Sequence, residues 1–147
     1  AMKKIIFLDI DGVLNSHHFF KTKYVKEKYD MFQADFNSID DEALKCLTSI
    51  VEQTKAEIVI SSTWRFNHYD TLLKIFELKN FPGKVVGKTE KGGCVRGCQI
   101  HEWLRNNKDY IGTESASGFD KYVIIDDDSD MLLWQKETMS MDFYQNT

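Results

Sequence analysis

The sequence lacks the features that mark several large classes of protein. It has no apolar run long enough to cross a bilayer, and acids interrupt its short N-terminal apolar stretch too early for a signal peptide. The net charge of -4 argues against a strongly basic nucleic-acid-binding surface over the whole molecule. Its three cysteines are an odd number without a disulfide-framework pattern, which favours a reduced, cytoplasmic protein.

The composition is that of a folded domain. The chain has 147 residues, of which 42% are hydrophobic and 29% charged, enough for a sizeable core and unlike a disordered chain. It contains no internal repeat, low-complexity segment or linker. We therefore expect a single domain over residues 1–147, with Ala1 as a tag remnant and no membrane partner. The oligomeric state stays open, and a monomer is a reasonable expectation.

Hydrophobic patterning predicts strands that alternate with helices. Short apolar and β-branched runs predict strands, whereas apolar residues spaced by three and four predict helices. The predicted strands are 4–8, 57–60, 85–86, 122–125 and 139–143, and the predicted helices are 40–53, 69–78, 98–106 and 131–136. This alternation predicts an α/β fold in which a mostly parallel sheet is covered by helices on both faces.

Polar residues follow three of the predicted strands. Asp9 and Asp11 follow the first strand, Ser61 the second, and Asp126 and Asp127 the strand at 122–125. Because the carboxyl ends of parallel strands share one edge of a sheet, these side chains should converge. Clustered carboxylates repel one another, and a hard cation such as Mg²⁺ relieves the repulsion and brings substrate phosphates with it. One acid can then serve as a nucleophile and another as a proton carrier.

Four motifs resemble those of the haloacid dehalogenase-like (HAD) phosphohydrolase superfamily. "DIDGVL" at 9–14 resembles the first motif, "IVIS" at 58–61 the second, Arg96 at a helix start the basic third, and "IIDDD" at 124–128 the fourth. They occur in order and span residues 5–128. The strings "SSTWR", "RGCQIHEWL" and "YVIIDDDSDM" are similar to a narrower group, the HAD domains of Swiss-army-knife RNA-repair proteins, and to the phosphatase domain of phage polynucleotide kinase-phosphatase.

The resemblance implies a three-layer, Rossmann-like fold and Mg²⁺-dependent phosphomonoester hydrolysis through an aspartyl-phosphate. Asp9 would attack phosphorus, and Asp11 would protonate the leaving oxygen and then activate water. Mg²⁺ would be held by Asp9, the backbone carbonyl of Asp11, and Asp127, while Asp126 would orient the metal's surroundings. The chemistry agrees with this set, because phosphoryl transfer depends mainly on positioning and charge neutralisation.

The phosphate-binding residues leave alternatives open. The resemblance gives Ser61 and Arg96 to the phosphoryl oxygens, and Gly12 lets the backbone turn sharply and approach the ligand. Ser61 could instead cap the helix that follows it, a role also open to its neighbours. Lys88 or Lys91 could supply the positive charge in place of Arg96.

The residues after Ser61 form a second group of candidates. Ser62, Trp64 and Arg65 are predicted to flank the substrate. The alternative for Trp64 is packing in the core, and the sequence does not separate the two roles.

A zinc site is a weaker possibility in the same part of the chain. Cys94, Cys98 and His101 have a spacing that could hold zinc, but a structural zinc site needs four ligands and no fourth is evident nearby.

The substrate is the least determined feature. Only a short, lid-like insert at about 15–38 follows the first motif, so we expect a minimal cap or none. An open site suits a bulky phosphorylated substrate such as a polynucleotide end, a nucleotide or a phosphoprotein. The insert contains "HHFFKTKYVKEKY", in which aromatics could stack on bases and lysines could contact phosphates. Alternatively, its aromatics pack on the core as an amphipathic lid.

Two other functions share part of this pattern. A receiver-like signalling domain also clusters acids at the edge of a parallel sheet, but places its phosphate-accepting aspartate on a later strand. A non-catalytic module for metal or nucleic acid would not need every motif residue. The acid two positions after Asp9 favours the phosphatase, because Asp11 can serve there as an acid and base.

Overall fold

The described residues in a computed structural model of the chain are 3–16, 38–90, 95–112 and 122–127. The predicted helix at 131–136, the predicted strand at 139–143 and most of the insert at 15–38 lie outside them.

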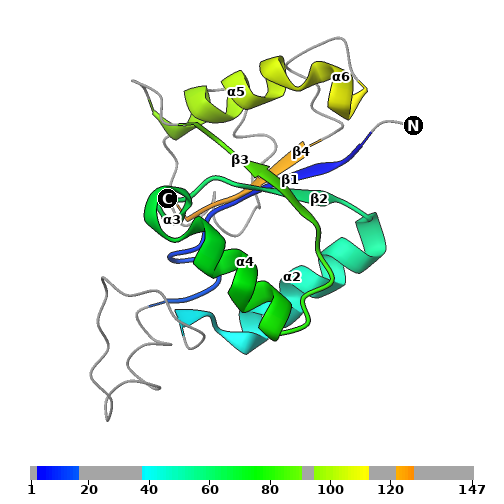
Figure 1. Ribbon diagram of the computed structural model, residues 1–147. Helices are drawn as coiled ribbons and strands as arrows, with labels where there is room; N and C mark the ends of the chain where they lie inside the picture. The colour runs from blue at the N-terminus through cyan, green and yellow to red at the C-terminus, as the bar shows by residue number, and fades with distance from the viewer. Residues whose placement is uncertain (1–2, 17–37, 91–94, 113–121, 128–147) are drawn as a thin grey trace.

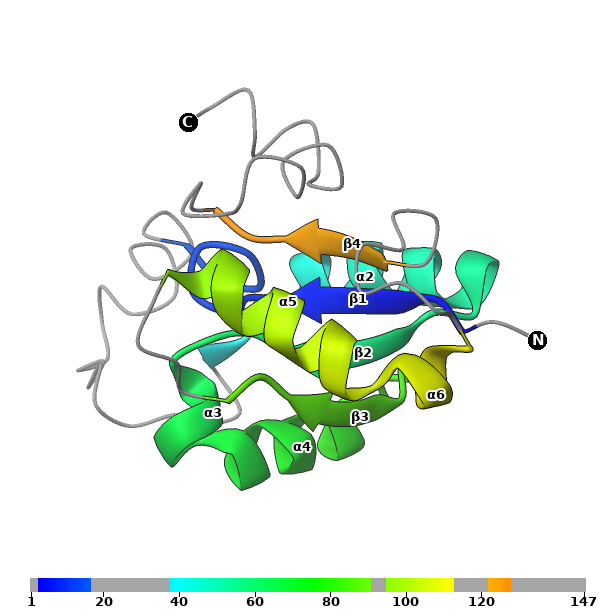
Figure 2. The ribbon, with the colours of Figure 1, turned by 90° about the horizontal axis from the view of Figure 1, so that it is seen from above.

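The described strands form one parallel sheet. They are β1 (Ile5–Leu8), β2 (Glu57–Ile60), β3 (Val85–Lys88) and β4 (Tyr122–Ile125), in the order β3-β2-β1-β4. The predicted bounds of β2 and β4 are those observed, while β3 runs two residues beyond its prediction. Figure 2 shows the four strands side by side and running in the same direction.

Helices cover both faces of this sheet, which confirms the predicted α/β class. They are α2 (Asp41–Thr54), α3 (Trp64–Asn67), α4 (Tyr69–Leu78), α5 (Arg96–Asn106) and α6 (Lys108–Ile111). In Figure 1, α2 and α4 lie on one side of the strands and α5 and α6 on the other. The sequence did not predict α3 or α6, because four residues are too few to display a helical period.

The alternation of side chains along β1 divides the core into two halves. Ile6 and Leu8 pack with residues of α2 and α4, whereas Ile5 and Phe7 pack with residues of α5 and α6. The ring of Phe7 meets the ring of Trp103 edge-on at 5.6 Å. Burial on both faces explains why β1 is apolar at every position rather than at alternate ones.

Glu57 is a buried acid at the amino end of β2, far from the strand ends discussed below. Its carboxylate accepts a hydrogen bond from the Tyr110 hydroxyl at 2.8 Å and lies 3.0 Å from Lys3 Nζ and 3.6 Å from Lys84 Nζ. Burial opposes the charge, but the bonds from Lys3 and Tyr110 outweigh it and lower the pKa of Glu57. These contacts connect α6 and the N-terminal segment to the sheet.

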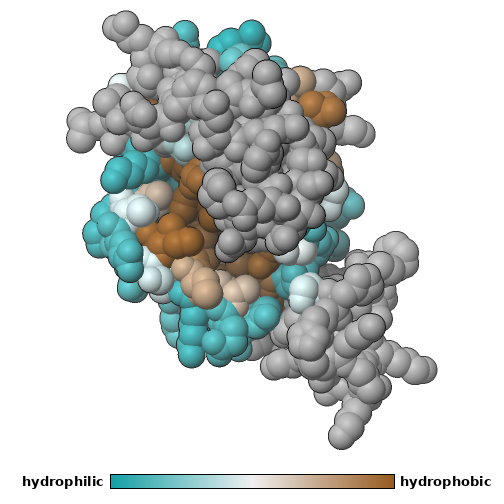
Figure 3. All heavy atoms as spheres, turned by 180° about the vertical axis from the view of Figure 1, so that it is seen from behind, coloured by the Kyte–Doolittle hydropathy of each residue, from teal (hydrophilic) through white to brown (hydrophobic). Residues whose placement is uncertain are grey.

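Part of the described surface is apolar when the molecule is seen from behind (Figure 3). There, apolar side chains gather in the middle of the face, with hydrophilic ones to their left and below them (Figure 3). Near the amino ends of β1 and β4, Ile6, Ile50 and Val123 help to line a shallow groove of about 160 Å³. No helix among the described residues has both the length and the apolar character needed to cross a membrane.

Candidate active site

A row of polar residues crosses the carboxyl edge of the sheet. Leu8 pairs with Ile60 and Ile125, and Ile60 pairs with Lys88, so the four strands end level with one another. The next residue in each strand is polar and buried, and across the sheet these residues are Thr89, Ser61, Asp9 and Asp126. The fold therefore places hydroxyl groups on the β3 and β2 side of this edge and acids on the β1 and β4 side.

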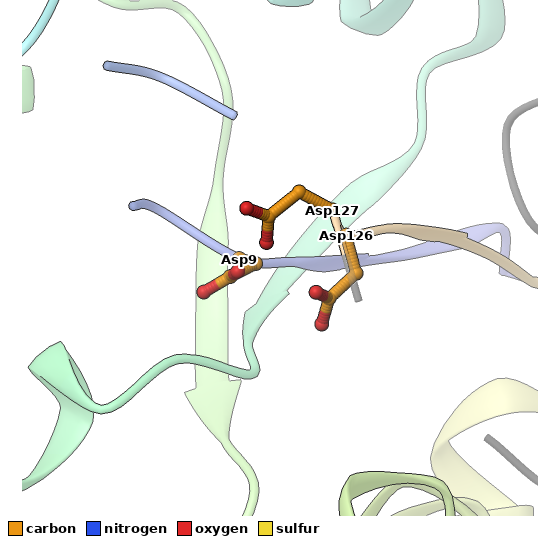
Figure 4. Close-up of side chains that lie close together, drawn as sticks. All are labelled: Asp9, Asp126 and Asp127. Carbon is orange, nitrogen blue, oxygen red and sulfur yellow. The ribbon is translucent and has the colours of Figure 1, made fainter. Parts of the chain in front are cut away.

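Three carboxylates gather at the acidic side of the row. One oxygen from each of Asp9, Asp126 and Asp127 lies within 4.8 Å of the others, and Figure 4 shows them approaching from the ends of β1 and β4. Arg96 Nη1, at the start of α5, lies 3.2 Å from Asp9 Oδ1 and donates to Asp126 Oδ2 at 2.9 Å. The sequence predicts that Asp9, Asp11, Ser61, Asp126 and Asp127 converge, and the three acids of this cluster do so, whereas Asp11 is not part of it.

Burial and a neighbouring acid disfavour the charged form of Asp9. Burial and the adjacent charge of Asp126 raise the pKa of Asp9 to about 8, although Arg96 and the Ile10 N–H oppose the rise. Three carboxylate oxygens this close to one another suit a hard divalent cation. The residues of the cluster thus fit the Mg²⁺ site that the motifs imply.

Gly12 leaves the space that Asp127 occupies. Its φ is +84°, a left-handed conformation that side chains disfavour, and a Cβ at this position would overlap the Asp127 carboxylate. The turn after β1 and the end of β4 therefore meet at a point where only glycine fits.

Asp11 stands apart from the acidic cluster. Its carboxylate is exposed, whereas Asp9 is 7% exposed. Trp64 Nε1 lies 3.2 Å from both Asp11 oxygens, and Asn15 Nδ2 donates to Asp11 Oδ1 at 3.1 Å. Both of these donor side chains are buried. The two acids of the first motif therefore occupy different environments, one enclosed with other acids and the other open and held by N–H donors.

Ser61 and Ser62 differ in their hydrogen bonds. Ser62 Oγ accepts a hydrogen bond at 3.3 Å from the N–H of Trp64, the first residue of α3, whose N-cap is Thr63. Ser61 Oγ is buried and has no hydrogen-bond partner within the described ranges. Because an unsatisfied buried hydroxyl is costly, Ser61 is the serine that is available for a ligand.

The comparison with protein families decides the family of this chain. A model of the HAD domain in Swiss Army Knife RNA repair proteins matches residues 5–145. The chain belongs to this family. The match confirms the resemblance seen in the four motifs and points to a hydrolase-type enzyme. Searches of curated proteins and of solved structures found no match.

In this HAD domain, Arg65 connects the segment after β2 to helix α5. Arg65 is 3% exposed, and its guanidinium donates to the Ser62 carbonyl and to Gln99 Oε1, each at 2.6 Å. Burial, and then the nearby charge of Arg96, lower the pKa of Arg65. The side chain is therefore enclosed beside the site, and it joins the serine segment to the helix that carries Arg96.

Of the two candidate cations that the structure describes, Arg96 and not Lys88 contacts the acidic cluster. Arg96 contacts two acids of the cluster, whereas Lys88 Nζ donates to the Arg65 carbonyl at 3.2 Å and lies over the Tyr69 ring. Lys91, the other cation considered from the sequence, lies outside the described residues.

The zinc alternative gains no support in the described part of the HAD domain. The group of potential metal ligands found there is the acidic triad, and Cys98 and His101 belong to no such group. Cys94 lies outside the described residues.

Sequence reasoning missed two polar residues of the site. The early end predicted for β3 left Thr89 away from any strand end, although it lies beside Ser61 in the polar row. Asn15 was assigned only to the start of the insert. A signal for Asn15 exists in hindsight, because an amide four residues after an acid can close a turn around it.

Proposed function

We propose that this HAD domain is a Mg²⁺-dependent phosphomonoester hydrolase that works through an aspartyl-phosphate on Asp9. The observation that carries the proposal is the contrast between Asp9 and Asp11. Asp9 is buried among acids that can share a cation, while Asp11 is exposed and lies outside that group. Two carboxylates in such different environments can serve as nucleophile and proton carrier in the same reaction.

The first step forms a bond between an Asp9 oxygen and phosphorus while the bond from phosphorus to the leaving oxygen breaks. Asp11 gives its proton to that leaving oxygen. In the second step Asp11, now a carboxylate, takes a proton from water as the water oxygen attacks the phosphorus of the aspartyl-phosphate. Inorganic phosphate leaves, the Asp9 carboxylate is restored and Asp11 again carries its proton.

The acidic triad is the set of residues that would hold the cation. Asp9 and Asp127 would supply carboxylate oxygens together with the backbone carbonyl of Asp11, and Asp126 would orient this group of ligands. Mg²⁺, when bound, neutralises charge on the acids and on the phosphoryl oxygens. The support for this assignment is the close approach of the three carboxylates and the raised pKa of Asp9.

Ser61 and Arg96 are the proposed ligands of the phosphoryl oxygens. The Ser61 hydroxyl is a buried donor beside Asp9 without a partner among the described residues. The Arg96 guanidinium already lies within 3.2 Å of the nucleophilic carboxylate, next to where a phosphoryl group on Asp9 would be. Preorganised donors at this position would stabilise the charge that develops on the phosphoryl oxygens.

The proposed substrate is a phosphorylated polynucleotide end or a nucleotide. The family description refers to RNA repair, which supports this class for the present chain without naming the substrate. The insert adds a local reason, because Asn15 Nδ2 donates to the Ser38 carbonyl and so joins the two ends of the insert beside Asp11. The aromatic and lysine residues between those ends could contact bases and phosphates.

The test is phosphate release from a panel of substrates in Mg²⁺ and in EDTA. The panel contains an aryl phosphate, mononucleotides, and RNA and DNA oligonucleotides phosphorylated at the 5′ or the 3′ end. Asp9→Asn should abolish release, and Asp109→Asn, the same change at an exposed acid of α6, should not. Preference for one oligonucleotide end would support the substrate class. The mechanism would be refuted if the unaltered protein released no phosphate in Mg²⁺, or if Asp9→Asn released phosphate at a near-normal rate.

A further inference from the structure

Asp11 is exposed, yet its carboxylate is held by two buried side chains. We infer that Trp64 and Asn15 are positioning residues that aim the Asp11 carboxyl group at the leaving oxygen. The inference rests on the proposed function, because it concerns the acid and base role given to Asp11. It gives Trp64 a role in orienting Asp11, which differs from the two roles considered from the sequence, substrate contact and core packing.

The indole of Trp64 is a fixed donor. Its ring is 6% exposed, belongs to the core cluster beneath α2 and α4, and meets the His68 ring edge-on at 5.8 Å. The peptide N–H of Trp64 is itself bound to Ser62 Oγ at the start of α3. A ring held in this way cannot follow a moving carboxylate, so the Asp11 group must adopt the orientation that the indole N–H sets.

The amide of Asn15 is fixed by a similar set of bonds. Asn15 Oδ1 accepts from the Gly12 N–H at 3.1 Å, and Nδ2 donates at 3.1 Å both to Asp11 Oδ1 and to the Ser38 carbonyl. The side chain is 4% exposed. Two immobile donors therefore determine the direction of one exposed carboxylate, which would otherwise rotate among several rotamers.

The pattern of bonds also distinguishes the two oxygens of Asp11. Within the described ranges, Oδ1 accepts from both Trp64 and Asn15, whereas Oδ2 shares only the indole N–H. The indole and the amide nitrogen can donate but cannot accept in these bonds. Oδ2 therefore accepts fewer of these bonds than Oδ1, and it is the Asp11 oxygen that we assign to the leaving oxygen.

Trp64→Phe separates this role from core packing. Phenylalanine keeps an aromatic ring in the core but removes the N–H that Asp11 accepts. Trp103→Phe is the matched control, because Trp103 packs edge-on against Phe7 in the other half of the core and no contact described for its indole involves an acid.

The measurement is kcat/KM in Mg²⁺ for phosphate monoesters whose leaving groups differ in pKa, from p-nitrophenol to an alkyl alcohol. General acid catalysis contributes about 10²–10⁴-fold, and it matters most for poor leaving groups. Trp64→Phe should therefore lower kcat/KM at least about tenfold for the alkyl ester and less than about threefold for p-nitrophenyl phosphate. Trp103→Phe should leave the dependence on the leaving group unchanged.

Two different results would overturn the inference. One is a fall in kcat/KM of Trp64→Phe that is equal for all leaving groups, or no fall at all, while the unaltered protein is active. If that variant does not fold, as judged by circular dichroism, Asn15→Leu is measured in its place, and an unchanged leaving-group dependence counts against the inference in the same way. If the unaltered protein hydrolyses none of the esters, the proposed function itself is refuted. This result distinguishes failure of the proposed function from failure of the inference.

Discussion

Asp127 packs against Gly12 so closely that a Cβ at residue 12 would overlap the Asp127 carboxylate. The two residues come from opposite ends of the described chain, one in the turn after β1 and the other directly after β4. In this position, an oxygen of Asp127 lies within 4.8 Å of an oxygen of Asp9. The geometry of the acidic cluster therefore depends on a residue that contributes no side chain.

Gly12→Ala should damage the site more than the fold. The substitution would push Asp127 away from Asp9, and it would place alanine at a φ of +84°, which costs about 1–2 kcal/mol. We expect phosphatase activity to fall at least about tenfold, because the proposed metal ligands separate. Activity and thermal unfolding of the variant are measured together.

Gly112→Ala is the control for backbone strain. Gly112 has a φ of +83° at the end of α6, so alanine meets the same strain there without an acidic neighbour of the site. It should lower stability by a similar amount and leave activity almost unchanged. Equal losses of activity in both variants would show that strain, and not the position of Asp127, explains the effect at residue 12.

Binding of Mg²⁺ should stabilise the folded protein through the acidic triad. A ligand that binds only the folded state at 100 times its dissociation constant contributes about 2.7 kcal/mol. We expect Mg²⁺ to raise the melting temperature of the unaltered protein and to raise it much less in Asp127→Asn. Asp70→Asn, at an exposed acid of α4, is the matched control and should keep the full response. An undiminished response in Asp127→Asn would place the cation elsewhere.

Local patterns in the sequence were sufficient for much of the fold. The bounds of β2, β4 and α4 were predicted to the residue, because each is either a short apolar run or a segment with a clear helical period. β3 was predicted too short, since Gly87 and Lys88 do not look like strand residues. Lys88 is in the strand because it pairs with Ile60 on β2, and such pairing is a long-range contact.

Long-range contacts also limit what the sequence can predict about the site. The motifs placed Asp9, Asp126 and Asp127 at one edge, because that conclusion needs only the direction of parallel strands. The hydrogen bond from Trp64 to Asp11 crosses 53 positions of the chain, and the bond from Asn15 to Ser38 crosses 23. A pattern of residue types does not encode which side chain will meet which across such distances, so the sequence could not choose among the roles of Trp64.

Gln99 should stabilise the fold by accepting a hydrogen bond from the guanidinium of Arg65, a buried residue. Its Oε1 accepts from Arg65 Nη2 at 2.6 Å, and removing it leaves a buried charged donor unpaired. We expect Gln99→Ala to lower the free energy of unfolding by about 1–3 kcal/mol. Gln53→Ala, at an exposed position where the side chain donates to Ser49 Oγ, should change it by less than about 0.5 kcal/mol. Urea denaturation measures both, and a Gln99 variant as stable as the Gln53 variant would contradict the expectation.

Glu57 gives the fold a dependence on acidic pH that is separate from the site. Burial alone would raise its pKa, but bonds from Lys3 and Tyr110 hold the pKa below the usual 4.5. The charged carboxylate therefore stabilises the fold above the unfolded pKa, and this stability is lost as the pH falls through the folded pKa. We expect Glu57→Gln to be about 1 kcal/mol less stable than the unaltered protein at pH 7 in urea denaturation. The difference should shrink as the pH falls below 4.5. Glu52→Gln, at an exposed position of α2, should show no such trend, and a Glu57 difference that stays constant with pH would exclude the carboxylate as its cause.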